Sequence, residues 1–295
     1  MKRCCIVFSF LFLVISLVAF PYNKSVFAET FPMSEMINPS KEMPDLLPSI
    51  RQIPLTKAEM QNFREEVTNQ QMVGEDARVV KEKLENVNPV TVDISANKLL
   101  RSNSASFVGA DSGHIYLSEQ PPRTQGEGGL DSNGWIDCRT EYIAPSAAGS
   151  GYAWGWIGKY INVTGSGSAN FNITFDGRYE GILEATNTFN TNTYCKIAAQ
   201  VCDVTDDNFS IVAENVVDER GFSFLLIPND VTGTIDSDHS IQTTLYAGHT
   251  YLLRLMLYTS AQTRWYTASI WGLSDFHSGG PDGQGLDYNS VSLTW

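Results

Sequence analysis

The sequence predicts a mainly β protein: an antiparallel β-sandwich of jelly-roll type, preceded by a short helical and extended N-terminal region. Short segments that alternate apolar and polar residues follow one another from residue 135 to residue 295. Turn-forming Gly, Asn, Asp and Pro separate these segments, and no helical periodicity intervenes. A series of strands without intervening helices is typical of a sandwich.

The predicted sandwich domain spans 135–295, and about 160 residues are enough to bury one core. The alternation places its strands at residues 135–143, 152–164, 168–176, 178–187, 194–204, 209–217, 221–227, 231–236, 239–246, 250–259, 264–271 and 287–295.

Residues 1–28 have the features of a signal peptide. Lys2 and Arg3 precede an apolar run of 15 residues, Ile6 to Phe20, and small residues end the segment at Ala28. A membrane-spanning helix needs about 20 residues. We therefore predict cleavage after Ala28, secretion to the cell surface or the extracellular space, and no membrane insertion of the mature chain. An uncleaved anchor is the alternative.

The charge of the mature chain excludes some partners. Residues 1–28 contain three basic residues and no acidic one, so 17 basic and 33 acidic residues remain, a net charge of −16. Such a chain repels phosphate backbones, which argues against nucleic acid as a partner.

Three segments lie between the leader and the sandwich. Residues 29–54 are rich in Pro, Met and Ser and indicate an extended or disordered segment. Residues 55–88 indicate helices, because Thr56 and Glu59 fit a capping box and Asn88-Pro89 ends the pattern. Residues 89–134 are interpreted as a transition and a Gly/Pro-rich linker.

Rows of aromatic residues carry the main question about function. On the strand at 152–164 the rings recur on one face, opposite an aliphatic face, and the strand at 264–271 alternates Trp with small hydroxyl residues. Exposed rings would form a ligand platform, whereas a covering N-terminal segment or a subunit interface would bury them. The candidate ligand-binding residues are Tyr152, Trp154, Trp156, Tyr160, Trp265 and Trp271.

Three cysteines follow the leader: Cys138, Cys195 and Cys202. Residues 194–204 read as one strand, in which Cys195 and Cys202 lie about 23 Å apart on opposite faces and cannot pair. A disulfide would therefore join Cys138 to Cys195 or to Cys202. Three reduced, buried cysteines are the alternative.

Acidic loops suggest one cofactor, calcium, which prefers six to eight oxygen ligands. Asp275, Asp282 and Asp287 fall in the longest such loop, although Asp and Gly also simply form turns. No other cofactor is expected.

Enzymatic motifs are weak. HExxH, a nucleophile elbow and phosphate-binding glycine loops are absent from the sequence. Glu141, Glu180 and Glu184 could supply a carboxylate pair for glycoside cleavage, but solvated strand charges explain them better. Catalysis is therefore not favoured.

The leading hypothesis is a secreted, non-catalytic binding module that recognises glycan or another cell-surface ligand through exposed rings. The first alternative is a structural or assembly protein of a cell envelope or extracellular matrix, with rings buried between subunits of a homo-oligomer. The second alternative is a hydrolase or lyase acting on polysaccharide.

Overall fold

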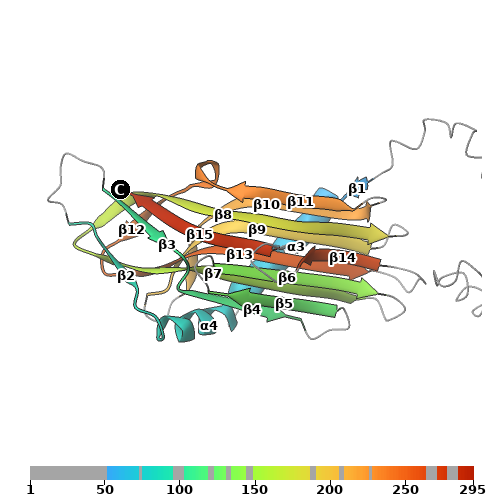
Figure 1. The fold of residues 1–295 in the computed structure, drawn as a ribbon, viewed down its shortest axis with the longest axis horizontal. Helices are drawn as coiled ribbons and strands as arrows, with labels where there is room; N and C mark the ends of the chain where they lie inside the picture. The colour runs from blue at the N-terminus through green and yellow to red at the C-terminus, as the bar shows by residue number, and fades with distance from the viewer. Residues whose placement is uncertain are drawn as a thin grey trace, which may run out of the picture.

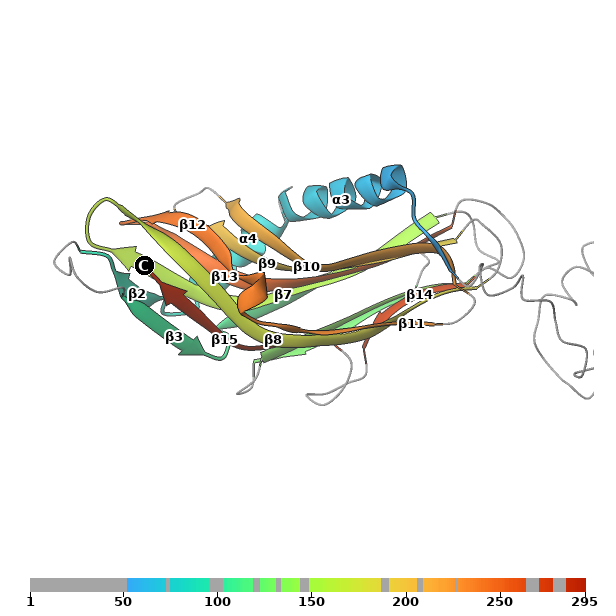
Figure 2. The ribbon, with the colours of Figure 1, turned by 90° about the horizontal axis from the view of Figure 1, so that it is seen from above.

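The computed structural model confirms the antiparallel β-sandwich. It describes residues 52–72, 75–95, 103–118, 123–130, 134–143, 149–186, 191–205, 209–225, 228–263, 271–277 and 285–295. The predicted signal peptide at 1–28 and most of the predicted extended segment at 29–54 lie outside these residues. Figure 1 shows the strands running along the long axis of the molecule, and Figure 2 shows the two layers that they form.

The first sheet has the strand order β1-β10-β9-β13-β7-β2, and β4 also pairs with β7. All its pairings are antiparallel except that of β2 with β7. Its strands are β1 (Gln52–Pro54), β2 (Val90–Asp93), β4 (Ser112–Leu117), β7 (Gly149–Thr164), β9 (Thr191–Asp203), β10 (Ser210–Leu225) and β13 (Thr250–Thr263).

The second sheet has the order β11-β8-β14-β6-β15-β3, with β12 paired to β8 and β5 to β6. A 3-10 turn, η3 (Ser237–His239), joins β11 to β12. The strands of the second sheet are β3 (Ser104–Val108), β5 (Arg123–Gly129), β6 (Gly134–Ile143), β8 (Ser168–Thr186), β11 (Asn229–Ile235), β12 (Ile241–Tyr246), β14 (Trp271–Phe276) and β15 (Gly285–Thr294).

The main core lies between the sheets and follows from strand alternation. Phe171, Ile173 and Phe175 on β8 face Leu253 and Leu255 on β13 across this space, as members of one buried cluster. The central strand β9 is buried on both faces, because a second apolar cluster covers the outer side of the first sheet. This double burial explains its continuous apolar sequence.

The helices α3 (Lys57–Met72) and α4 (Glu75–Leu84) confirm the predicted helical segment. The capping box forms as expected: the Thr56 amide donates to Glu59 Oε2 at 2.9 Å, and the Glu59 amide donates to Thr56 Oγ1 at 3.3 Å. Figure 2 shows both helices lying along the outer face of the first sheet. Neither described helix is long and apolar enough to cross a membrane.

The interpretation of residues 89–134 as a linker is wrong. Four strands, β2 to β5, come from this segment and pair with β7, β15 and β6. The Gly-rich run is strand β5, where glycine provides space: a Cβ on Gly126 would lie 2.6 Å from Ile115 Cγ2. These glycines make room for a neighbouring side chain and do not form turns.

Two pairs of predicted strands are each a single long strand. The described residues of the predicted strands 168–176 and 178–187 all belong to β8, and those of 209–217 and 221–227 belong largely to β10. Gly177 and Gly221 sit inside these strands and approach a neighbouring backbone or side chain closely. The predicted strand at 264–271 falls mostly outside the described residues, and β14 begins only at Trp271.

The expected disulfide is not present in the structure, which has Cys138, Cys195 and Cys202 as free, buried cysteines. Cys195 lies in the core between the sheets and Cys202 on the opposite face, as their odd spacing predicts. Each thiol packs among apolar residues of its own cluster, so the part of the chain that the structure describes agrees with the alternative of three reduced cysteines.

We expect these thiols to be unreactive in the folded protein. Burial raises the pKa of all three, that of Cys202 to about 12, and the thiolate is the reactive form. A disulfide-exchange reagent at pH 8 should modify none of them in the natively folded fragment 29–295 and all three after denaturation. Detection of only one thiol in the denatured, unreduced chain would show that the other two cysteines are joined in a disulfide.

Candidate functional site

The aromatic row of β7 lies beneath the helices. Trp154, Trp156 and Tyr160 are at most 1% exposed and belong to a cluster that also contains Phe63 of α3 and Val80 of α4. We call this buried layer the helix-covered cluster. The prediction that these three rings form an exposed platform is therefore wrong, because residues of the predicted helical segment cover them.

A buried ion pair joins α4 to the sheet within the helix-covered cluster. Asp76 and Arg254 are both fully buried, and Arg254 Nη1 lies 2.9 Å from Asp76 Oδ2. The other carboxylate oxygen accepts hydrogen bonds from Tyr116 Oη at 2.9 Å and from Trp156 Nε1 at 3.0 Å. Each of these polar groups is held by another part of the same chain, so their role is structural.

The other rings of the predicted platform do not complete a surface. Tyr152 is half-buried, and its ring stacks on Tyr258 with centroids 6.0 Å apart. Trp265 and the side chain of Trp271 lie outside the described residues; the Trp271 backbone pairs with Ile143 and Thr186. The structure therefore does not bring the six candidate rings together.

The candidate calcium ligands are also separated. Asp275 lies opposite Ile182 on β8 and Asp287 lies opposite Arg178, four residues or about 13 Å along the strand. Each is already paired with arginine, Asp275 with Arg139 at 3.2 Å and Asp287 with Arg178. Asp282 lies outside the described residues, among which no group of three or more potential ligands is placed to hold a metal ion.

Acidic side chains do gather on the outer face of the second sheet. Glu141 and Glu184 flank Leu273 on neighbouring strands, and Asp275 is two residues further along β14. Burial raises the pKa of Glu184, and the Asp275 charge adds to the effect. Arg139 neutralises this face, because it lies 3.1 Å from Glu141 and 3.2 Å from Asp275. Glu180 lies on the same strand as Glu184 but pairs with Thr232 and Gly285.

A pocket of about 470 Å³ opens where β8, β12 and the chain end meet, and we call it the Trp295 pocket. Its lining has amide, hydroxyl and aromatic groups and no ionisable side chain: Asn170, Phe171, Asn172, Gln242, Thr243, Thr244, Thr294 and Trp295.

Strand register assembles the Trp295 pocket. Asn170 and Asn172 on β8 pair with Thr244 and Gln242 on β12, and Thr244 Oγ1 donates to Asn170 Oδ1 at 2.8 Å. The Trp295 ring stacks on the Phe171 ring, with centroids 5.2 Å apart.

Two lining atoms lack partners. Asn172 Oδ1 and Trp295 Nε1 are buried and make no hydrogen bond with any described residue. Sequence analysis missed this pocket. The alternating polar residues of β8 and β12 were visible, but the pairing that places them side by side was not.

Comparisons with known proteins do not assign the chain to a family. No protein-family model and no curated protein sequence matches the chain. The CBM22-1–GH10 modules of Clostridium thermocellum endo-1,4-beta-D-xylanase 10B, complexed with xylohexaose, give a TM-score of 0.20 and 9% identity over 60% of this chain and 25% of that chain.

Two other solved structures are similar at the same level. The N-terminal cellulose-binding domain of Cellulomonas fimi beta-1,4-glucanase C gives a TM-score of 0.18 and 12% identity over 62% of this chain and 90% of that one. TmCBM61, complexed with beta-1,4-galactotriose, gives a TM-score of 0.16 and 10% identity over 59% of this chain and 86% of that one. Carbohydrate-binding neighbours are compatible with a glycan-binding sandwich, but these TM-scores are too low to carry an argument for it.

Proposed function

We propose that this chain is a secreted, non-catalytic module that binds neutral glycan in the Trp295 pocket. The observation that carries the proposal is the lining of that pocket, which combines amide and hydroxyl side chains with an aromatic ring and contains two unpaired polar atoms. The signal-peptide pattern of residues 1–28 supports secretion.

The chemistry of the lining fits sugar better than a charged ligand. Amide and hydroxyl groups both donate and accept hydrogen bonds, as sugar hydroxyls do. The apolar C–H face of a sugar ring packs on an aromatic ring such as Trp295. No ionisable side chain lines the pocket, which offers nothing to neutralise an acidic ligand. Its volume of about 470 Å³ falls within the usual range for small-molecule sites.

The two unpaired atoms favour binding of a ligand that can form hydrogen bonds with them. A buried donor or acceptor without a partner costs about 1–3 kcal/mol. A ligand hydroxyl that donates to Asn172 Oδ1, or accepts from Trp295 Nε1, removes that cost.

We expect Trp295→Phe and Asn172→Ala each to weaken glycan binding about three- to tenfold, because each removes one hydrogen bond between neutral groups. The mature chain would first be screened against an array of neutral and acidic glycans. The best ligand would then be titrated by calorimetry. Trp135→Phe is the matched control: it makes the same chemical change at a half-buried tryptophan outside the pocket.

Equal binding by the two pocket variants and the parent would refute this site, and binding of acidic glycans alone would refute its assignment to neutral sugar. Absence of binding to every glycan would refute the function. Light scattering on the same samples tests the assembly alternative, which requires an oligomer without ligand.

A further inference from the structure

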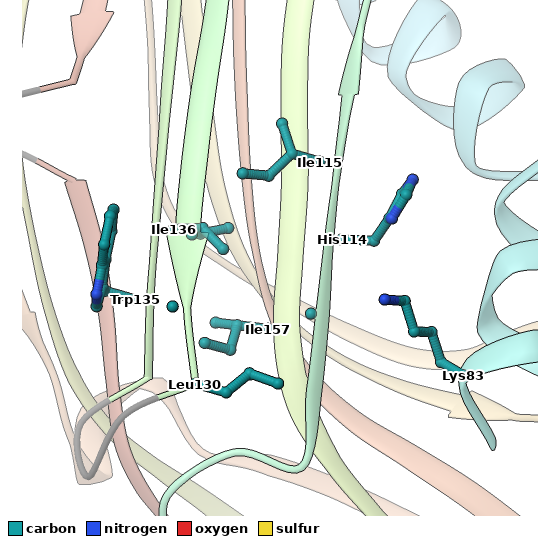
Figure 3. Close-up of a pocket in the computed structure, with 10 residues that line it drawn as sticks. Lys83, His114, Ile115, Leu130, Trp135, Ile136 and Ile157 are labelled. Atoms are coloured by element: carbon teal, nitrogen blue, oxygen red, sulfur yellow. The ribbon is translucent and has the colours of Figure 1, made fainter. Parts of the chain in front are cut away.

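A second pocket, of about 300 Å³, lies at the edge of the sandwich beside β4 and β5, and we call it the Gly113 pocket (Figure 3). It shares no lining residue with the Trp295 pocket. Its two ends differ in chemistry, and the difference defines the kind of molecule it can hold.

One end is apolar. Ile115, Ile136 and Ile157 come from β4, β6 and β7 and lie together in Figure 3, with Leu130 below them. Ile136 and Ile157 are at most 2% exposed, whereas Leu130 is 52% exposed. The apolar end therefore reaches from the core to an exposed leucine at the surface.

The other end is polar and basic. Figure 3 shows His114 and Lys83 on the opposite side of β4 from Ile115, with Lys83 reaching from the end of α4. Lys83 forms no ion pair with any residue the structure describes. Burial lowers the pKa of His114, and the Lys83 ammonium lowers it further, although Asp76 and Glu75 oppose them. The net lowering favours the neutral form of His114, and Lys83 supplies the charge.

Gly113 lies where the two ends meet. A Cβ at this position would be 3.0 Å from the Trp156 carbonyl oxygen and 3.7 Å from Ile157 Cβ. Glycine therefore lets β4 lie close against β7 here, at the place where the lining passes from the isoleucines to the lysine.

We propose that the Gly113 pocket binds a small amphiphile, with a medium-length alkyl chain against the isoleucines and a carboxylate at Lys83. Charge complementarity supports the head group, because the Lys83 ammonium borders the pocket and has no ion-pair partner among the described residues. The neutral His114 ring can donate a second hydrogen bond to the carboxylate. The apolar walls supply the rest of the affinity.

The test is a calorimetric titration of the mature chain at pH 7.5 with alkanoates of six to twelve carbons, below their micelle concentrations, and with the alcohols of equal length. We expect affinity to rise about fourfold for each methylene until the pocket is full. We expect each carboxylate to bind about fivefold more tightly than its alcohol, because the ion pair is partly exposed to solvent.

Two kinds of variant separate the head from the tail. Lys83→Met should abolish the preference for carboxylate while alcohols still bind, Lys83→Arg should retain the preference, and Lys57→Met on α3 is the matched control for loss of one charge. Leu130→Asp changes an exposed side chain and should weaken alkanoates at least tenfold.

Several outcomes would overturn the proposal. These are no binding of any alkanoate up to its micelle concentration, equal affinity for alkanoate and alcohol, or an unchanged preference in Lys83→Met. Tighter binding of alkyl phosphate than of the alkanoate of equal length would overturn the carboxylate assignment. None of these results bears on the Trp295 pocket.

Discussion

Replacing Asp76 by alanine is expected to lower the free energy of unfolding by about 3–5 kcal/mol, because it leaves the Arg254 guanidinium buried without a counter-charge. Tyr116 Oη and Trp156 Nε1 lose their acceptor at the same time. The measurement is chemical denaturation of residues 29–295, followed by tryptophan fluorescence and by circular dichroism.

The control is Glu82→Ala on the same helix. Glu82 pairs with Arg78 at 3.0 Å on the exposed side of α4, and such pairs contribute about 0.3–0.5 kcal/mol. Asp76→Asn keeps an acceptor for Tyr116 but loses the charge. Its loss of unfolding free energy should fall between those of Asp76→Ala and Glu82→Ala. If Asp76→Ala lowered the free energy of unfolding by less than about 1 kcal/mol, this would contradict a buried ion pair between the Asp76 carboxylate and Arg254.

A fragment that begins at Trp135, the predicted start of the sandwich domain, is expected not to fold. It lacks α3, α4 and strands β1 to β5, so the outer face of the first sheet is uncovered. Burying one large apolar side chain contributes about 1.5–3 kcal/mol. The total stability of a domain is about 5–15 kcal/mol. Partial exposure of four such side chains therefore removes much of that stability. The four side chains are Trp154, Trp156, Tyr160 and Met256.

The matched fragment is 52–295, which keeps every described element. It should melt within a few degrees of residues 29–295, whereas the fragment starting at Trp135 should aggregate or give no cooperative transition in a thermal scan. A cooperative transition of the shorter fragment, at a similar temperature, would mean that the helices are dispensable and that the helix-covered cluster is not part of the fold.

Local signals made the helices predictable. The Thr56–Glu59 capping box is a contact between residues three apart, and it forms as the sequence suggests. Most strands of the sandwich were also predictable, because alternation is a local pattern. Strands β2 to β5 were not, because their short length and their glycines resemble a linker until Ile115 is placed over Gly126.

The sites depended on information that no short stretch of sequence contains. Alternation shows that Trp154 and Trp156 share a face, but not that Phe63 and Val67, about ninety residues earlier, cover it. The Trp295 pocket likewise needs residues from β8, β12 and the chain end, so the pairing of three distant segments had to be known before Asn172 could be selected.

Asp76 is synthesised well before the strand that carries its ion-pair partner. Its partner Arg254 lies 178 residues later, and β1 pairs with residues of β10 about 170 positions away. The helices therefore leave the ribosome long before the strands that hold them exist. Folding of this topology is a late, slow step dominated by non-local contacts. A chain of this kind is expected to stay unfolded through most of its synthesis, which is the state that the proposed secretion requires.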